Sequence, residues 1–208
     1  MQTRSMDPKY NIMKKLLVIL FVLISAYYSF AQTTTWKDDP DHSKLTFVVT
    51  HRGFSSISGL FQKFDATVTS SKPDFSNAVF ELSTDVASIN TEVKMRDEHL
   101  KSPDFFNVAK YPTMTFKSTS IVNTTGMKNR YRIIGDLTMH GVTKSVTMDL
   151  WFRGTVDDAM PQKTKAGFQL TGVISRADFG IGPADPFDIS TEVMIKADGE
   201  FFKIQPQH

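Results

Sequence analysis

The stretch Asp97–Phe116 reads D-E-H-L-K-S-P-D-F-F-N-V-A-K-Y-P-T-M-T-F and holds the densest cluster of special residues in a chain that otherwise alternates between apolar and polar positions. It opens with a polar run that tolerates a helix, and Pro112 restricts Tyr111 to extended geometry. Met114 and Phe116 then share one face of a strand. We therefore expect a short helix that crosses the fold and is followed by a strand.

Outside this stretch, apolar and polar residues alternate in runs that are typical of strands with one dry and one wet face. Gly53 and Gly59 mark a turn or bulge after the first run, and residues 36–43 form a polar entry. Eight antiparallel strands in one small domain leave no open edge if they close into a barrel. The sequence predicts an all-β fold with one short helix and an antiparallel barrel of about eight strands, over residues 44–51, 64–68, 80–86, 114–120, 131–139, 146–152, 168–174 and 189–197.

The predicted helix spans Thr91–Leu100, with Thr91 as its cap. Arg96 and Asp97 resemble catalytic residues, but neighbours on a helix point about 100° apart and do not converge on one reacting atom. We expect them to pin the helix to the barrel through an ion pair and caps. Arg176 and Asp178 are expected to act in the same way.

The N-terminal segment has the pattern of a signal peptide. Lys14 and Lys15 precede the apolar run Leu16–Ile24, and the small residues that follow predict cleavage after Ala31. The run is short for a membrane span. Residues 1–31 are therefore interpreted as a leader, in which residues 1–12 form either a misassigned start or a cloning remnant, and residues 32–208 as the exported, soluble domain.

Charge and cysteine content limit the possible functions. The leader carries four of the 24 Lys and Arg residues and one of the 22 Asp and Glu residues, so the exported part is close to neutral. This excludes the basic footprint of a nucleic-acid-binding protein. With no cysteine in the chain, thiolate catalysis, cysteine-ligated zinc and a lipid-modified N-terminal cysteine are excluded, and the fold depends on its core alone.

No motif for catalysis or metal binding stands out. No two histidines lie two or four positions apart, so no local metal site is predicted. There is no G-x-S-x-G, no G-x-G-x-x-G and no P-loop. We therefore expect neither an enzyme nor a metal protein from the five histidines, which are His42, His51, His99, His140 and His208.

The remaining candidate site is the apolar interior of the barrel. His51 shares the apolar face of the first strand, where it either contacts the headgroup of a ligand or is a core histidine bonded to the backbone. Periodicity alone does not distinguish a filled core from a lined tunnel. The candidate lining residues on the dry faces, besides His51, are Phe47, Val49, Phe80, Leu82, Phe116, Ile133, Leu137, Leu150, Phe168 and Val193.

Three segments in order resemble the YceI-like family of secreted lipid-binding proteins. They are Asp97–Phe116, Gly135–Thr143 (G-D-L-T-M-H-G-V-T) and Arg176–Ile181 (R-A-D-F-G-I), and the resemblance runs from about residue 36 to 202. It implies a lipocalin-like barrel whose elongated pore takes a polyisoprenoid, such as a quinone tail, or a comparable long acyl chain. No cofactor is expected besides that lipid.

The resulting hypothesis is a periplasmic or secreted carrier or reservoir for such a lipid, without catalysis. A transient membrane contact and a homodimer are both compatible with it. Two alternatives remain open. One is an enzyme that acts on a lipid headgroup, which requires His51 or His99 at the pore mouth beside a second titratable group. The other is a solidly packed barrel that works as an interaction or stress protein.

Overall fold

The structure is a computed structural model that describes residues 33–158, 163–183 and 187–204, so the predicted leader lies outside the described residues. The chain forms a single α-helix in these ranges, α2 (Lys94–Lys101), and two short 3-10 helices, η1 (Val86–Ser88) and η2 (Arg176–Phe179). No helix in the described part is both long enough and apolar enough to cross a membrane. The strands are β1 (Thr34–Asp38), β2 (Lys44–His51), β3 (Ser55–Phe61), β4 (Phe64–Ser70), β5 (Val79–Asp85), β6 (Ile89–Asn90), β7 (Thr113–Asn123), β8 (Arg130–Met139), β9 (Val142–Asp158), β10 (Lys163–Ser175) and β11 (Glu192–Lys203).

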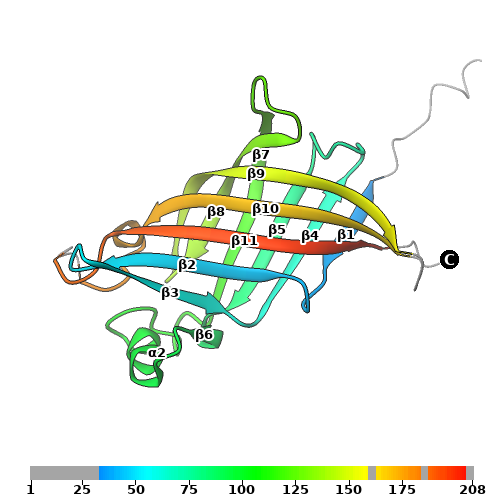
Figure 1. Ribbon diagram of the computed structural model, residues 1–208. Helices are drawn as coiled ribbons and strands as arrows, with labels where there is room; N and C mark the ends of the chain where they lie inside the picture. The colour runs from blue at the N-terminus through cyan, green and yellow to red at the C-terminus, as the bar shows by residue number, and fades with distance from the viewer. Residues whose placement is uncertain (1–32, 159–162, 184–186, 205–208) are drawn as a thin grey trace, which may run out of the picture. The chain divides into compact units, whose positions relative to one another are not determined.

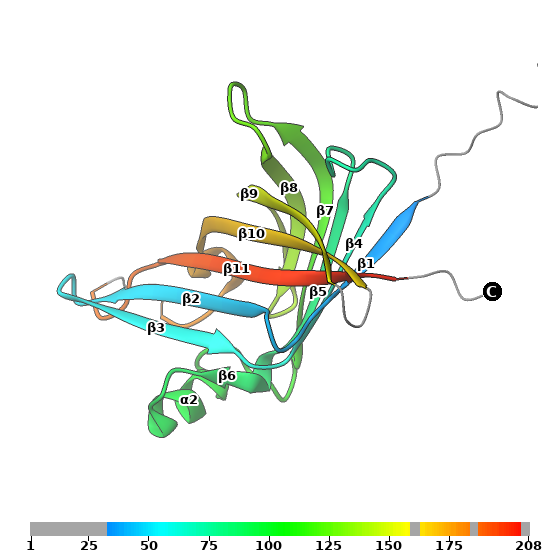
Figure 2. The same cartoon turned by 45° about the vertical axis from the view of Figure 1, so that its right-hand side comes forward.

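Eight of these strands close into an antiparallel barrel. Their order is β1-β4-β5-β7-β8-β9-β10-β11, and the ring closes where Trp36, Lys37 and Asp38 of β1 pair with the end of β11. Figures 1 and 2 show the strands curving around one interior from two directions. The predicted all-β fold, with a closed barrel of about eight strands and one short helix, is confirmed.

The eight barrel strands are not all the predicted ones. β1 lies in the segment that was expected to be a polar entry, and five residues are too few to show an alternating pattern. Its side chains nevertheless alternate, because Trp36 and Asp38 are buried. β2 is confirmed as a strand, but with β3 and β6 it extends from the side of β11 instead of closing the ring.

The prediction of a turn or bulge at two glycines was right for one and wrong for the other. Gly53 lies in the β2–β3 turn with a positive φ of 72°. Gly59 lies inside β3, paired with Phe47 across the ladder. A Cβ atom at Gly59 would lie 2.4 Å from Cζ of Phe47, so the glycine makes room for an aromatic ring over the strand.

One end of the barrel is filled by an aromatic cluster that we call the aromatic plug: Phe75, Trp36, Phe152 and Phe168. Phe75 enters from the β4–β5 loop and is only 1% exposed. Its ring centroid lies 5.4 Å from Trp36, 4.7 Å from Phe152 and 4.9 Å from Phe168. The hydroxyl of Tyr131 donates a hydrogen bond to the carbonyl oxygen of the preceding residue, Asp74, which holds the loop in place.

The helix differs from its prediction in two respects. It begins at Lys94, three residues after the predicted cap, and its N-cap residue Val93 makes no side-chain hydrogen bond. Thr91 instead donates its hydroxyl to Asp97 at 2.6 Å and accepts from Nε of Arg96 at 2.7 Å. The arginine and the aspartate thus hold the helix to Thr91 through hydrogen bonds, in place of the ion pair to the barrel that was expected.

Candidate functional site

An apolar cavity lies beside α2, at the end of the barrel away from the aromatic plug. We call it the proximal cavity, and its empty volume, part of which is open to solvent, is about 740 Å³. Strands β2, β3 and β11 supply one wall, and α2 with the segment after it supplies another. Its apolar lining includes Phe47, Val49, Ile57, Phe61, Leu100, Phe105, Phe106, Val193 and Ile195.

Among the described residues that line the proximal cavity, only Thr91, Arg96 and Arg176 have polar side chains. The described lining contains no acidic residue to balance the two guanidinium charges. The N–H donors of both arginines are, however, largely engaged in hydrogen bonds. Arg96 donates from Nη2 to the backbone oxygen of Thr91 at 2.6 Å. The cavity is therefore an apolar space with two firmly held guanidinium groups at its edge.

Arg176 fastens the loop residues 181–183 and 189–190 beside this cavity. It is 5% exposed, and its Nη1 donates to the carbonyl oxygens of Ile181 at 2.8 Å and Pro183 at 2.7 Å. Its Nη2 and Nε donate to Ile189 at 2.8 Å and Ser190 at 3.0 Å. Burial lowers the pKa of this guanidinium, because desolvation disfavours its charge. The expected pinning role thus relies on backbone carbonyls.

A second space, the distal cavity, lies between the proximal cavity's side of the barrel and the aromatic plug. Its empty volume, part of which is open to solvent, is about 530 Å³. Phe168 belongs both to its wall and to the plug, so the plug closes this cavity at one side. Its apolar lining includes Phe64, Phe80, Leu82, Phe116, Leu150, Phe168, Leu170 and Phe201.

An open groove runs outside the proximal cavity. We call it the outer groove, and its empty volume, open to solvent, is about 2180 Å³. The β2–β3 turn, α2 and the loop around residue 188 border it. Five residues line both the groove and the proximal cavity, so their side chains form the partition between them: Ile57, Arg96, Leu100, Phe105 and Ile189. The groove thus adjoins the cavity across this partition.

The structure distributes the predicted lining residues over four places. Phe47, Val49 and Val193 line the proximal cavity, and His51 lines the outer groove. Ile133 and Leu137 are buried, 0% and 4% exposed, and are not among the lining residues of either cavity. The other five line the distal cavity: Phe80, Leu82, Phe116, Leu150 and Phe168. In place of one continuous bore, the described barrel has two separate apolar spaces.

Several wall residues of the proximal cavity were missed. Ile57 and Phe61 belong to β3, which was read as a turn because of its glycine. Phe105 and Phe106 follow α2, and no periodicity marks them as wall residues, although two adjacent phenylalanines in a polar segment were a signal. Ile181 comes from the loop that Arg176 fastens.

Two histidines lie at the groove. His51 forms an isolated bridge with Ile189, in the loop that Arg176 fastens. Nε2 of His99 lies 3.5 Å from a carboxylate oxygen of Asp104, and both side chains are exposed. Of the others, His140 places Nδ1 3.0 Å from the carbonyl oxygen of Phe179.

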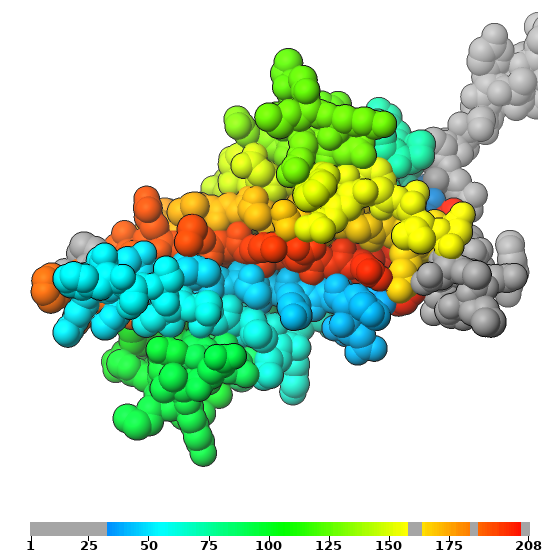
Figure 3. All heavy atoms as spheres, viewed as in Figure 1, coloured from blue at the N-terminus to red at the C-terminus, as the bar shows by residue number. Residues whose placement is uncertain are grey.

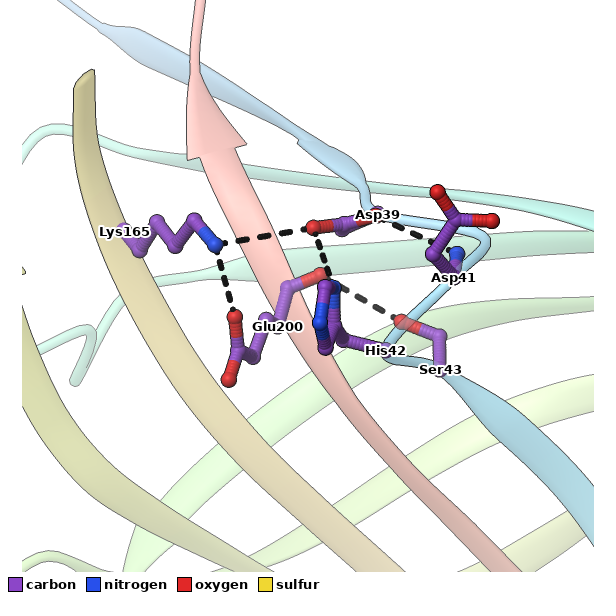
Figure 4. Close-up of polar contacts among 6 residues, drawn as sticks. All are labelled: Asp39, Asp41, His42, Ser43, Lys165 and Glu200. Atoms are coloured by element: carbon purple, nitrogen blue, oxygen red, sulfur yellow. Dashed lines mark hydrogen bonds and ion pairs between the residues drawn. The ribbon is translucent and has the colours of Figure 1, made fainter. Parts of the chain in front are cut away.

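A third histidine belongs to a polar cluster at the start of β2, drawn in Figure 4. Nδ1 of His42 lies 2.9 Å from Oδ2 of Asp39, and Nζ of Lys165 lies 3.6 Å from the same oxygen and 3.0 Å from Glu200. The three groups Asp39, His42 and Glu200 have the donors for a cation. The ammonium of Lys165 already supplies the positive charge between the two carboxylates. We therefore interpret the cluster as a structural one that holds neighbouring segments together, and we call it the latch.

The latch ties the β1–β2 connection to β10 and β11. Asp39 is 6% exposed, and burial by itself would raise its pKa. Hydrogen bonds from His42 and from the backbone N–H of Asp41, with the nearby ammonium of Lys165, outweigh burial and hold the pKa below its ordinary value. Asp39 is therefore a buried carboxylate that stabilises the fold when ionised.

Comparisons with known proteins agree with this architecture. The family model of the YceI-like domain matches residues 36–201. The chain is 36% identical over 177 residues to Protein YceI of Escherichia coli, covering 82% of this chain and 91% of that protein. It is 36% identical over 179 residues to a UPF0312 protein of Pseudomonas savastanoi, covering 85% of this chain and 91% of the relative.

Two solved structures show the same fold. BcnA of Burkholderia cenocepacia superposes with a TM-score of 0.68 at 26% identity, covering 78% of this chain and 98% of that one. A polyisoprenoid binding domain from Saccharophagus degradans, implicated in plant cell wall breakdown, has a TM-score of 0.58 at 16% identity, covering 83% of this chain and 100% of that one. This second likeness is one of fold. The family match over most of the chain, with the identity to the two relatives, shows that the chain belongs to the YceI-like family.

Proposed function

We propose that this protein is a carrier or reservoir that holds a polyisoprenoid or a comparable long-chain lipid in the cavities of its barrel, without catalysis. The observation that supports it most is the proximal cavity, an apolar space at the end of the barrel between strands β2 and β3 and helix α2, which is separated by a partition from an open groove. Membership of the YceI-like family and the polyisoprenoid-binding description of the Saccharophagus degradans domain point the same way. The predicted leader indicates that the protein is exported to the periplasm or to the cell exterior.

The lining of the cavities suits an apolar ligand. Both cavities are lined mainly by apolar side chains, which is typical of ligand pockets. Burial contributes about 0.8 kcal/mol per methylene, so about ten methylenes contribute about 8 kcal/mol, or micromolar affinity before the cost of ordering the chain. Part of a tail in the proximal cavity is therefore sufficient for binding.

A pair of matched substitutions tests the proposal. Val193→Asp places a carboxylate in the wall of the proximal cavity, whereas Val173→Asp makes the same change on the neighbouring strand β10, where the side chain faces outward and is 55% exposed. Native mass spectrometry of protein purified from its own host is expected to show a defined lipid adduct on wild type and Val173→Asp, and none on folded Val193→Asp.

Two outcomes contradict the carrier. One is a folded Val193→Asp variant that keeps its full lipid content. The other is wild-type protein whose organic extract contains no lipid, which favours an interaction protein with a packed barrel.

A second candidate function is favoured by one observation. The enzyme alternative requires a histidine at the mouth beside another titratable group, and His99 beside Asp104 in the outer groove meets that requirement. Hydrolysis of a lipid ester added to the protein, lost in both His99→Gln and Asp104→Asn, would establish it. Unchanged ester in the presence of wild type would exclude it for that ester.

A further inference from the structure

Exposed apolar side chains stand at the rim of the outer groove. Phe54, at the tip of the β2–β3 turn, is 95% exposed, and Met95, in the first turn of α2, is 85% exposed. Val93, just before α2, is 46% exposed. Met95 and Val93 line the groove, and Phe54 precedes the groove residue Ser55. We call Phe54, Val93 and Met95 the rim residues.

The rim residues come from two separate segments that reach the same end of the barrel. In Figures 1 and 2 the β2–β3 turn and α2 both lie at the end away from the C-terminus, and Figure 3 shows the green part of the chain with α2 projecting below the strands. A single exposed apolar residue on a surface is ordinary. Exposed apolar tips on two segments that flank an apolar cavity are unusual. Each tip exposes apolar surface to water beside the path that a lipid must take.

The charges of the groove are balanced. Its described lining contains two arginines and two aspartates. Nε of Arg52 lies 2.9 Å from Asp188, and His99 lies 3.5 Å from Asp104. Arg96 is hydrogen-bonded to Thr91. The groove therefore offers no excess of charge that would select an acidic partner, and any docking there depends on the apolar tips.

We propose that the rim is the surface by which the protein docks on a lipid bilayer, with Phe54 and Met95 inserted at the boundary between headgroups and acyl chains. Apolar side chains with charged neighbours are typical of segments that lie in this interface. The outer groove would then face the bilayer, and because it shares a partition with the proximal cavity, a lipid tail would pass between bilayer and cavity without crossing water. The purpose of docking rests on the proposed carrier function.

The bilayer fits the rim better than a protein partner does. Between its apolar tips the rim carries the ion pair of Arg52 with Asp188 and the contact of His99 with Asp104, so the apolar surface is interrupted by charge. A protein interface of useful size needs a contiguous, desolvated centre. A fluid interface accepts separate apolar tips and leaves the charges between them in the hydrated headgroup layer.

Vesicle binding with a matched control tests the proposal. The rim variant is Phe54→Asp with Met95→Asp, and the control is Val122→Asp with Met127→Asp, which changes two side chains that are 56% and 62% exposed near the β7–β8 turn, away from the groove. Co-sedimentation with phosphatidylcholine vesicles is expected to show at least a tenfold loss of bound protein for the rim variant and none for the control. Raising the salt to 0.5 M should change wild-type binding less than twofold, because the groove is balanced in charge.

Several results would overturn the docking surface. They are wild type that does not sediment with the vesicles, a rim variant that binds like wild type, and equal losses for both variants. A rim variant that instead converts a wild-type dimer to a monomer in analytical ultracentrifugation would identify the rim as an interface between two copies, which also overturns the proposal.

A second measurement separates this proposal from the carrier function. Delipidated wild type, rim variant and control are titrated with a fluorescent long-chain fatty acid in the absence of vesicles. Equal binding by all three, with vesicle association lost only in the rim variant, supports both proposals. No probe binding by any of them, together with rim-dependent vesicle association, contradicts the carrier alone. Equal probe binding and rim-independent association contradicts the docking surface alone.

Discussion

Phe75 closes one end of the barrel, although it comes from a loop. Its backbone has a positive φ of 59°, which is unusual for a residue other than glycine, and its ring is 1% exposed. The loop holds this geometry through the hydrogen bond from Tyr131 to Asp74 and through the amide of Phe75 itself, which donates to Lys72. The packing of one aromatic ring thus compensates for a strained backbone.

Removing this ring should be costly. We expect Phe75→Ala to lower the free energy of unfolding by about 3–5 kcal/mol, because the surrounding rings collapse only in part around the space left behind. Urea unfolding followed by circular dichroism measures the loss. Phe54→Ala, which removes the same ring from a site that is 95% exposed, should change stability by less than about 0.5 kcal/mol. Equal effects of the two substitutions would show that Phe75 is not the plug.

Asp39 makes the stability of the fold depend on pH. Its pKa in the folded protein lies below the ordinary value of 3.8, so the unfolded chain binds the proton more tightly. The contribution is complete above pH 3.8, falls as the pH drops below that value, and is gone below the folded pKa. Asp39→Asn should therefore reduce the stability at pH 7 by about 1.5 kcal/mol, and the variant should lose less stability than wild type between pH 7 and pH 3.

Urea unfolding at several pH values between 3 and 7 gives this dependence directly. Asp41→Asn is the control, because that side chain is exposed and only its backbone N–H contacts Asp39. A pH profile that is the same in wild type and Asp39→Asn would contradict the role of the latch.

At the scale of elements, the alternation of apolar and polar residues predicted the strands whose sequences alternate. It failed for elements whose sequence is determined by another constraint. Strand β8 buries every second residue over its whole length, and the first half of β11 alternates exposed and half-buried residues, so their pattern was readable. β3 was not, because Gly59 reads as a turn residue, and only the ring of Phe47 across the ladder explains it. The start of α2 was misplaced because Thr91 is engaged by Arg96 and Asp97 instead of capping the helix.

The site was less predictable than the fold. Strand parity assigns a side chain to the interior, but which interior residues touch and which leave space depends on packing between distant segments. Ile133 and Leu137 have the same parity as cavity residues, yet they are buried in the packed core. Conversely, Phe105, Phe106 and the loop held by Arg176 follow no period, so their part in the cavity wall becomes visible only in three dimensions.

The loop held by Arg176 is an element whose order depends on one side chain. Arg176→Met leaves four carbonyl oxygens without their donor, and we expect a loss of about 3 kcal/mol in stability, since each such bond involves a charged donor. Hydrogen exchange of the amides of Ile181 and Ser190 should accelerate more than exchange in β8. Arg153→Met, at an arginine that is partly exposed, should affect neither. Uniform acceleration over the whole chain would mean that the arginine supports the barrel and not the loop.

At the scale of the whole molecule, the two ends of the barrel have opposite characters. The end with the aromatic plug is packed, and the end with α2 holds the proximal cavity and its groove. β2 and β3 extend beyond the closed ring at the second end, where β3 pairs only with β2 and the two-residue strand β6 among the described strands. Elements outside the ring have fewer neighbours and open more readily. A lipid in the proximal cavity would add contacts to these less supported elements.

Lipid loading should therefore stabilise the molecule unevenly. At a ligand concentration a hundred times the dissociation constant, binding raises the free energy of unfolding by about 2.7 kcal/mol. Hydrogen exchange compared between delipidated protein and protein loaded with a long-chain fatty acid should slow most in β2, β3 and α2, which border the proximal cavity. The β7–β8 turn, which borders neither cavity, serves as the internal reference. Slowing that is strongest beside the aromatic plug would place the lipid in the distal cavity instead, because Phe168 is shared by the plug and that cavity's wall.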